Sequence, residues 1–309
     1  MLLLLSPENT QNRICAVIVT FNPILAILLE LIANIAANVA AIVIVDNGSI
    51  KDFSEHFRSD IKVHFHPLPE NLGIGAAQNI GIQFAIAHNF THVLLMDQDS
   101  IPECNMIQRL TAALDTLSNQ GKRISAVGPR YLDPATGYSS PFASLGWPTF
   151  RLEYPPYKHE FIQSDFLISS GSLIALDTLR HVGGMEESLF IDLVDTEWFF
   201  RAQSLGYSAF GVPDAIMHHQ LGDRVIRVWL GRWRQVPYHS PARHYYFFRN
   251  SIHLMRKKHV PLQWILNNSI QLLYMIFFFP IFTAPRFSHL QLMLKGIKDG
   301  ICGKSGRLD

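Results

Sequence analysis

The chain has 309 residues, of which 48% are hydrophobic and only 17% are charged. A chain of this length and composition can bury one large core or two modest ones, so a disordered or collagen-like protein is excluded. The cysteines Cys15, Cys104 and Cys302 are far apart and form no C-x-x-C pair, so neither a disulfide framework nor a thiolate zinc site has support, and a reducing compartment is favoured.

The formal net charge of +1 hides a division along the chain. Residues 1–223 carry 12 basic and 23 acidic side chains, whereas residues 224–309 carry 14 basic and 2 acidic ones. An acidic body with a basic end is typical of a nucleic-acid-binding arm or of a segment that rests on anionic lipid. The residue types next to the basic side chains therefore indicate whether this segment binds nucleic acid or anionic lipid.

Short apolar runs rich in β-branched residues alternate with longer helical patterns through the first 130 residues. Strands are predicted at residues 14–20, 41–46, 62–66, 92–97 and 124–128. Helices are predicted between them, at residues 24–40, 52–57, 76–88 and 105–117. This alternation predicts an α/β fold with a Rossmann-like, mostly parallel sheet and helices on both faces. Such sheets bind ligands beyond the carboxyl ends of their strands, so the residues after the strands are the first candidates for a site.

The pattern changes after residue 130. Residues 131–165 are rich in proline, glycine and aromatic side chains without clear periodicity, which predicts loops. Further elements are predicted as a strand at residues 166–174, a short helix from residue 177, a stronger helix at residues 195–205 and a strand at residues 208–213. The second half thus supplies less sheet than the first and more of the loops that cover it.

The most apolar stretch, residues 263–284, lies in the basic end of the chain. A transmembrane helix needs about 20 uninterrupted apolar residues. Polar residues and a proline interrupt this stretch at Asn267, Asn268, Gln271 and Pro280. Aromatic residues stand beside arginines and lysines here, which predicts an interfacial helix on a membrane surface and disfavours nucleic acid. A core helix or a dimer interface is the alternative.

The first residues, MLLLLS, are too short for the apolar part of a secretory signal and have no basic segment before them. We therefore expect a cytoplasmic protein that is peripheral on a membrane.

Two carboxylates follow the fourth predicted strand, in the sequence Asp97-Gln98-Asp99. If the chain turns there, one carboxylate can hold a ribose or a water, and the other a hard divalent cation that bridges a pyrophosphate. A D-x-D pair by itself equally fits a solvated turn in which an aspartate caps the helix after Pro102. The pair is a candidate metal site that needs the support of its neighbours.

Residues 71–81, NLGIGAAQNIG, form a glycine-containing loop that leads into a helix. Gln78 stands where a dinucleotide fingerprint requires glycine, and no acidic residue ends a strand about 20 residues later, so NAD binding is disfavoured. The free N–H groups of such a helix start still suit a phosphate or a sugar. A plain loop before a helix that packs through small residues is the structural alternative.

The densest acidic cluster places Asp192, Asp195 and Glu197 among six large apolar side chains. Burial there is costly for a carboxylate unless it is paired, and it raises the pKa toward that of a useful general base. The structural alternative is a helix start, with Asp195 as the N-cap and Glu197 paired with Arg201 one turn later. Both interpretations hold together, because capping would fix the position of the carboxylate that acts.

A pair of histidines, His218 and His219, follows the strand predicted at residues 208–213. A histidine at this place could complete the coordination of a cation or contact a phosphate. In a chain with 14 histidines, however, an isolated pair is more often structural.

The order of these motifs resembles that of the family 2 inverting glycosyltransferases of the GT-A fold. Polar residues follow the first two strands, N-x-G-x-G follows the third, D-x-D follows the fourth, and an acidic cluster and a histidine come later, so the match covers about residues 14–223. The sequences DLVDTEW, HQLG, HYY with RN, and GICGK also look like the rhamnosyltransferase branch that builds bacterial surface polysaccharide such as O-antigen.

The resemblance implies a division of the chain into two parts. Residues 1–223 would form a GT-A catalytic domain, with a nucleotide-binding half at residues 14–130 and an acceptor-binding half at residues 131–223. Residues 224–309 would form a helical, membrane-proximal region.

The resemblance also assigns a role to each matching residue. Asp99 would bind Mg²⁺ or Mn²⁺ with help from His219, and Asp195 would be the catalytic base. The family usually has an adjacent Glu-Asp pair, but Val194 precedes Asp195 here, so Asp192 or Glu197 would supply the second carboxylate. The residues that would hold the nucleoside or line the nucleotide-sugar pocket are Thr20, Asn22, Asp46, Asn71, Gly73, Asn79 and Asp97.

The reaction that this resemblance implies is a metal-dependent, inverting transfer of a sugar, with dTDP-L-rhamnose as the expected donor. The expected acceptor is a saccharide on polyprenyl diphosphate at the cytoplasmic face of the bacterial inner membrane, where the basic C-terminal region would rest. A UDP-linked galactofuranose or another UDP-hexose is the alternative donor. A homodimer is the alternative use of the apolar C-terminal region.

Three other classes of protein compete with this interpretation. An aspartyl-phosphate hydrolase carries its D-x-D motif after the first strand, whereas three strands precede Asp97 here. A nucleotidyltransferase has a glycine-rich loop with an arginine after its first strand, where this chain has Thr20-Phe21-Asn22-Pro23. A non-catalytic assembly partner is the third alternative, and the complete set of candidate site residues argues against it.

Overall fold

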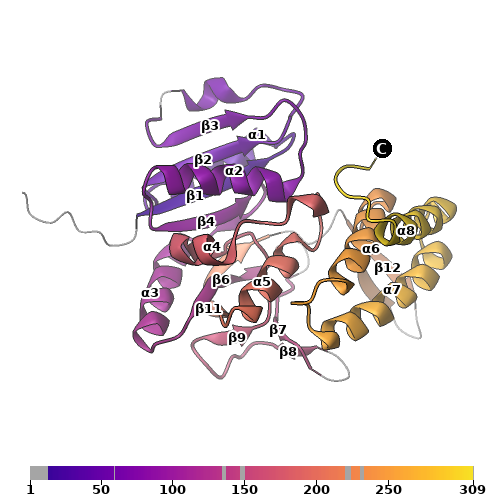
Figure 1. Cartoon of the computed structure of the whole chain (residues 1–309). Coiled ribbons are helices and arrows are strands. Elements are labelled where there is room, and N and C mark those ends of the chain that lie inside the picture. Colours follow the sequence, from indigo (N-terminus) through magenta and orange to yellow (C-terminus); the bar gives the residue numbers. More distant parts are fainter. Residues whose placement is uncertain are drawn as a thin grey trace, which may run out of the picture.

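The computed structural model describes residues 13–58, 60–133, 137–146, 150–219, 224–229 and 233–308. It shows a sheet flanked by helices and, beside it, a group of C-terminal helices (Figure 1). The N-terminal MLLLLS, residues 220–222 of the HQLG sequence and the predicted domain boundary at residue 223 lie outside the described residues.

The central sheet has the strand order β3-β2-β1-β4-β10-β6-β11-β5, with β9 paired to β11. Its strands are β1 (Ile14–Thr20), β2 (Ala41–Asp46), β3 (Val63–Pro67), β4 (His92–Asp97), β5 (Ile101–Pro102), β6 (Ile124–Leu132), β9 (Ile162–Ser164), β10 (Leu173–Ala175) and β11 (Ser208–His218). The first four strands in space are parallel, β6 is parallel to β11, and β10 runs antiparallel between β4 and β6. The predicted mostly parallel α/β sheet is confirmed.

The inner strands form because they are covered on both faces. All seven residues of β1 are buried. Their side chains alternate, so that Cys15 and Val17 belong to one core and Ile14 and Ala16 to the other. β-Branched side chains pack well on such a pleated surface, and a continuous apolar run is typical of a strand buried on both sides.

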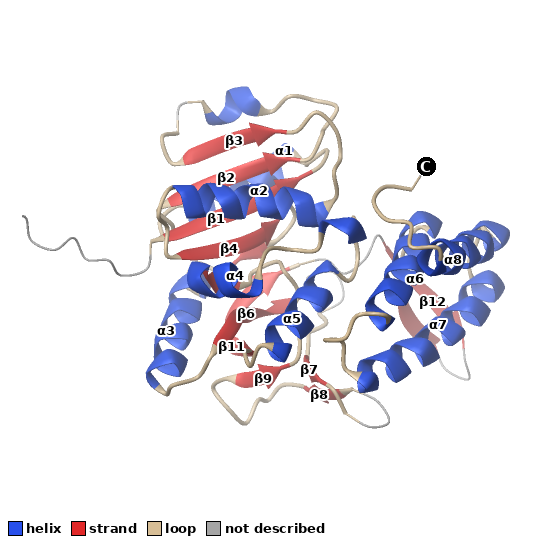
Figure 2. Ribbon diagram, in the orientation of Figure 1, coloured by secondary structure: helices blue, strands red, loops and turns tan. Residues whose placement is uncertain are grey.

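Helices complete the two layers around the sheet (Figures 1 and 2). One core includes apolar side chains of α1 (Leu25–Ile35) and α3 (Met106–Asn119). The other includes those of α2 (Ile74–Ala87), α4 (Leu176–Val182) and α5 (Val194–Ser204). Helices therefore cover both faces, as the sequence pattern predicts.

Several predicted boundaries differ from the structure. α1 ends at Ile35, and the helix expected at residues 52–57 is a 3₁₀ turn, Ser54–Phe57. The strand expected at residues 166–174 is reduced to the three residues of β10, because the turn Ser169-Ser170-Gly171 interrupts the run, with Gly171 at φ 81°. The region predicted as loops also contains β7 (Phe142–Ser144), β8 (Arg151–Glu153) and β9.

The C-terminal part begins with the hairpin of β12 (Arg224–Trp229) and β13 (Trp233–Tyr238). Three helices follow, α6 (Pro241–Met255), α7 (Leu262–Phe282) and α8 (Arg286–Ile301). α6 and α8 approach closely because α8 carries glycine at the contact. A Cβ on Gly296 would lie 2.6 Å from the carbonyl oxygen of Tyr245, and one on Gly300 would lie 2.8 Å from that of Arg249. Only glycine permits this distance.

α7 corresponds to the predicted apolar stretch and includes Pro280 in its last turn. Among the described residues it is the one helix whose length and composition would let it cross a membrane, and 28% of its apolar window is buried inside the protein. The same length and composition also occur in core helices and in helices that lie on a membrane surface.

Candidate functional site

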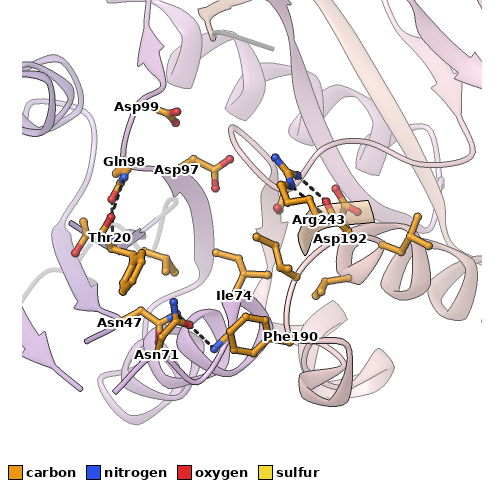
Figure 3. A pocket seen from close by; sticks show the side chains of 18 of the residues that line it. Thr20, Asn47, Asn71, Ile74, Asp97, Gln98, Asp99, Phe190, Asp192 and Arg243 are labelled. Atoms are coloured by element: carbon orange, nitrogen blue, oxygen red, sulfur yellow. Dashed lines mark hydrogen bonds and ion pairs between the residues drawn. The ribbon is translucent and has the colours of Figure 1, made fainter. Parts of the chain in front are cut away.

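A cavity of about 680 Å³ lies beyond the carboxyl ends of β1 and β4, where an α/β sheet binds its ligands (Figure 3). Loops from both halves of the chain and one residue of α6 contribute to its wall. The polar and charged residues that line it are Thr20, Asn47, Asn71, Asp97, Gln98, Asp99, Ser169, Asp192, Asp195, His219, His239 and Arg243. The cavity thus brings together most of the residues singled out in the sequence.

Thr20 and Asp46 stand at the ends of neighbouring strands and are directly bonded. The Thr20 hydroxyl donates to Asp46 Oδ1 over 2.7 Å, and the Ser49 hydroxyl and amide also donate to this carboxylate. Asp46 is 5% exposed and is not part of the cavity wall. Asn22, at φ 48°, accepts a hydrogen bond from Ile50 N and is also outside the wall. In this structure Asp46 and Asn22 shape the loops, and Thr20 faces the cavity.

Asn47 lines the cavity, although the sequence analysis did not select it. Its Nδ2 donates to Asn71 Oδ1 over 3.1 Å, and its Oδ1 accepts from Leu72 N over 2.8 Å. Asn71 Oδ1 also accepts from Gly73 N. Asn47 follows the second strand directly, so its position at a strand end was the signal that could have identified it.

Gly73, in the cavity wall, lets the start of α2 touch the loop that precedes α5. Its φ is 92°, and a Cβ there would lie 2.6 Å from the carbonyl oxygen of Phe190. The next amide, Ile74 N, donates to that oxygen over 2.7 Å. Any larger residue would push the two loops apart.

Asn79 was expected to line the pocket, and its side chain points elsewhere. Its Oδ1 accepts from Met185 N over 2.7 Å, and its Nδ2 donates to Met185 O and to Glu187. It lies in the second turn of α2, one turn past the residues that reach the cavity. Asn79 therefore ties α2 to the chain before α5 and is not part of the cavity wall.

The carboxylates of Asp97 and Asp99 and the imidazole of His219 form the one group in the described chain that could hold a metal ion. One ligand atom from each lies within 4.8 Å of the others. The antiparallel pairing of His218 with Ile101 brings the end of β11 beside the D-x-D turn. Ser100 Oγ lies 2.9 Å from His219 Nδ1 and holds the ring. His218 instead points to Glu103 at the surface, over 3.6 Å.

Electrostatics at this group favour a cation. Burial raises the pKa of Asp97, and the nearby carboxylates of Asp99 and Asp195 add to the rise. His219 and Arg243 oppose it, and the resulting pKa is about 6. Three carboxylates thus lie close together at one end of the cavity, with Asp99 the most exposed of them. Two oxygen ligands and one nitrogen ligand suit Mg²⁺ or Mn²⁺, so the residues present fit the expected ion.

The loop before α5 and the first turn of α5 each present one carboxylate to the cavity, Asp192 and Asp195. Phe190, Asp192 and Leu193 have φ values of 63°, 65° and 63°, an unusual backbone for residues with side chains. α5 begins at Val194, so Asp195 lies in the first turn and is not the N-cap that the sequence suggested. Burial raises the pKa of Asp195, the amide of Thr196 opposes the rise, and Asp192 adds to it.

Arg243 of α6 reaches this loop, and it was not among the site residues predicted from the sequence. Its Nη2 lies 2.6 Å from Asp192 Oδ1, and both side chains line the cavity (Figure 3). Arg243 directly precedes the HYY sequence, but no spacing in the chain connects it with a residue 51 positions earlier. Asp192 therefore carries a fixed counter-ion, whereas no counter-ion is described for Asp195 in the part of the chain that the structure covers.

Glu197 was a candidate for the second acidic residue, and the structure places it outside the cavity. It is fully buried, and its carboxylate contacts Arg201 over 2.9 Å, Lys257 over 3.1 Å and His259 over 2.9 Å. The predicted pair with Arg201 is present. The other two partners come from the C-terminal part, so Glu197 joins α5 to the segment between α6 and α7, and Asp192 is the acidic neighbour of Asp195.

The fold is that of a glycosyltransferase of the GT-A type. Residues 15–167 match the family model described as Glycosyl transferase family 2. The dTDP-rhamnosyl transferase RfbF of Shigella flexneri is 32% identical over 300 residues, which are 96% of this chain and 98% of that protein. The chain belongs to glycosyl transferase family 2.

Solved structures with much lower identity share the fold. GalNAc-T7 with UDP, GalNAc and Mn²⁺ superposes with a TM-score of 0.59 at 15% identity over 95% of this chain, which spans only 56% of that one. S. aureus TarS 1-349 in complex with UDP-GlcNAc gives a TM-score of 0.53 at 12% identity, over 96% of this chain and 94% of that one. These similarities support the GT-A architecture, including C-terminal elements.

Proposed function

We propose that the protein transfers L-rhamnose from dTDP-L-rhamnose to a saccharide hydroxyl with inversion at the anomeric carbon. The observation that carries this proposal is that one cavity joins the Asp97, Asp99 and His219 group with Asp195. The name of the 32% identical relative supports the donor. The UDP complexes of the more distant structures favour a UDP-sugar as the second candidate.

Asp97, Asp99 and His219 would hold Mg²⁺ or Mn²⁺. The ion, when bound, would neutralise charge on the diphosphate of the donor. The protein's own contribution is to hold the three ligands together: Ser100 orients His219, and Ser170 Oγ accepts from Asp97 N over 3.0 Å. These contacts fix the ring of His219 and the backbone at Asp97 before the ion and the donor bind.

Asp195 is the general base of the proposed reaction. Its raised pKa makes it a better proton acceptor than an ordinary aspartate, and it lacks the arginine partner that holds Asp192. The acceptor O–H proton moves to the Asp195 carboxylate while the acceptor oxygen bonds to the anomeric carbon. The bond from that carbon to the β-phosphate oxygen breaks, and its electron pair leaves with the nucleoside diphosphate.

Binding of nucleotides tests the donor and the metal together. Thermal shifts would be measured with dTDP, UDP, GDP, CMP and NAD, each with and without Mn²⁺. A ligand at 100 times its Kd adds about 2.7 kcal/mol to the free energy of unfolding, which is readily seen. We expect the largest Mn²⁺-dependent shift with dTDP. A preference for UDP would replace the donor, and no response to any nucleotide in folded protein would reject the proposed enzyme.

We also propose that the protein rests on the cytoplasmic face of the bacterial inner membrane, where a polyprenyl-diphosphate-linked saccharide would be the acceptor. Exposed apolar side chains recur every three or four residues along α7, including Leu262, Ile270 and Phe277, each more than 60% exposed. The opposite side of α7 packs against the other C-terminal helices. The surrounding segment, residues 224–309, is strongly basic, which suits anionic lipid.

Flotation with vesicles of anionic and of neutral lipid tests this location. Ile270→Glu with Phe277→Glu should abolish binding to anionic vesicles, because charge on the apolar stripe opposes its burial in lipid. Ile61→Glu is the matched control, since Ile61 is 94% exposed on the catalytic part. Retained binding by the double variant would reject the proposed contact, and a wild-type dimer that the double variant breaks would assign the stripe to self-association.

A further inference from the structure

Backbone carbonyls of the loop before α5 converge on one side chain of α6. The amide nitrogen of Asn250 lies 2.9 Å from Leu189 O, 2.7 Å from Ile191 O and 2.9 Å from Asp192 O. Asn250 is fully buried, and its own oxygen accepts from Arg249 Nε over 3.0 Å. Every polar atom of this side chain is therefore used. Buried carbonyls left without such donors would destabilise this arrangement.

Arg249 adds to the same contact. Its guanidinium is fully buried. Nη2 donates to Ser188 O and Leu189 O, and Nη1 donates to Gly306 O. No carboxylate lies within ion-pair distance of it among the described residues. Its charge is instead held by these carbonyls and by the rings of Tyr245 and Tyr246, 5.6 Å and 5.1 Å away.

The start of α2, in the part of the cavity proposed to bind the nucleotide sugar, holds the loop from its other side. Phe190 O accepts from Ile74 N at the start of α2, directly after Gly73. Figure 3 shows Phe190 beside Ile74 and Asn71, with Asp192 on the side of Arg243. Two of the left-handed residues direct their carbonyls to different helices: that of Phe190 reaches α2, and that of Asp192 reaches Asn250 of α6. The loop thus lies between the start of α2 and α6, and its position depends on both.

We propose that Asn250, supported by Arg249, is a positioning residue that fixes the loop carrying Asp192 and leading to Asp195. The C-terminal helices then complete the active site in addition to any contact with membrane. This inference rests on the proposed function for the roles of the two carboxylates. The left-handed backbone at three residues is unfavourable by itself. The loop therefore keeps this conformation only because hydrogen-bond donors around it hold its carbonyls in place.

Residues near the C-terminus contact both this loop and α6. Gly306 N donates to Ser188 O over 2.9 Å, and Leu308 N donates to the Tyr246 hydroxyl over 2.7 Å. The Tyr246 ring in turn stacks on Phe190, with 5.0 Å between centroids. Residues 303–308 therefore brace Arg249 and the loop together.

The central variant is Asn250→Asp, which keeps the size of the side chain and removes its N–H donors. Asn250→Ser is a milder second variant, because its hydroxyl retains one donor. Asn268→Asp is the matched control: Asn268 is 2% exposed on α7, and its Nδ2 has no hydrogen-bond partner among the described atoms. It repeats the buried substitution without touching the loop.

Three measurements distinguish positioning from a general loss of structure. Amide hydrogen exchange of residues 188–197 should rise in Asn250→Asp and remain unchanged in Asn268→Asp. The Kd for dTDP with Mn²⁺ should stay within about twofold, because the nucleotide side of the cavity keeps its own bonds. Turnover of dTDP-L-rhamnose, followed as release of dTDP, should fall about 100-fold in kcat, the size expected for a misplacement near 1 Å, and less in Asn250→Ser.

The outcomes separate this proposal from the proposed function. Unchanged exchange in the loop would overturn the positioning role whatever the donor is, and faster exchange with unchanged kcat would overturn its link to catalysis. A wild-type protein that releases no dTDP would count against the proposed donor. Amide hydrogen exchange of residues 188–197 would still decide whether Asn250 positions the loop.

Discussion

Arg243 on α6 and Asp192 in the loop before α5 form an ion pair with 2.6 Å between Nη2 and Oδ1. The pair spans 51 positions of sequence and joins the C-terminal helices to the catalytic cavity. Asp195, in the first turn of α5, has no such arginine partner among the described residues, and this difference is the reason to assign the base to Asp195.

Asp195→Asn should reduce turnover by about 100-fold or more, because an amide cannot accept the proton of the acceptor hydroxyl. The Kd for the nucleotide should be nearly unchanged, since Asp195 is not among the residues expected to hold it. Steady-state kinetics and nucleotide titration measure the two effects separately. Full activity in Asp195→Asn would refute the assignment.

Arg243→Gln should move the acid limb of the pH–rate profile to higher pH. Arg243 lowers the pKa of Asp97 and balances Asp192, which in turn raises the pKa of Asp195. Loss of the cation therefore disfavours the ionised carboxylates, and a higher pH is needed to form them. The measurement is kcat/KM from pH 5 to 9, and a shift to lower pH would contradict the electrostatic argument.

Arg243→Lys separates the charge of this residue from its geometry. The ammonium keeps the positive charge but loses the paired donors of the guanidinium. Its acid limb should stay close to that of the wild type, while kcat falls because Asp192 is held less firmly.

Glu197→Gln should destabilise the fold by about 3 kcal/mol, because Arg201 loses its anion and Lys257 keeps only the partly buried Glu186. Activity per folded molecule should remain, since Glu197 does not line the cavity. Denaturant unfolding and specific activity test this pair of results. Asp177→Asn is the control: it removes an exposed pair with Arg180 and should change stability by less than about 0.5 kcal/mol.

His244 should make the protein less stable as the pH falls below about 6.5. Burial and the neighbouring His289, whose Nδ1 is 2.9 Å from His244 Nδ1, lower the pKa of His244 to about 3. The unfolded chain binds a proton at about pH 6.5 that the folded protein excludes, so stability is present above this pH and is lost below it. The loss due to His244 is about 2 kcal/mol between pH 6.5 and 5.

Urea unfolding at pH 7 and pH 5 measures this effect. His244→Asn should show a smaller difference between the two pH values than the wild type, whereas His66→Asn, at an exposed position, should show the same difference. An equal loss in His244→Asn and the wild type would contradict the prediction.

Local patterns sufficed for the sheet and for the residues at its strand ends. The predicted strands at residues 14–20, 41–46 and 92–97 coincide with β1, β2 and β4, because an apolar β-branched run bounded by polar residues admits few other structures. The run at residues 166–174 failed because apolar composition could not show that Ser169-Ser170-Gly171 makes a turn.

The candidate site residues differ in the same respect, since some follow strands and others lie on helices. Thr20, Asn71, Asp97 and Asp99 reach the cavity because they follow strands of one parallel sheet, and parallel strands end at one edge. Asn79 and Glu197 carry suitable side chains in suitable segments, but the direction of a helical side chain depends on what the helix packs against. Their partners, Met185 and Lys257, could not be identified from spacing.

The sequence by itself determined the α/β sheet, the D-x-D site at its edge, the acidic cluster and the basic, apolar end, because each follows from residues adjacent in the chain. Only the tertiary structure decided that Asp192 is neutralised by Arg243, that Glu197 is a buried link between the two parts, and that Asn250 holds the loop before α5. These contacts join residues more than 50 positions apart. Local propensity carries no information about them, and they form only when helices that fold for other reasons are packed together.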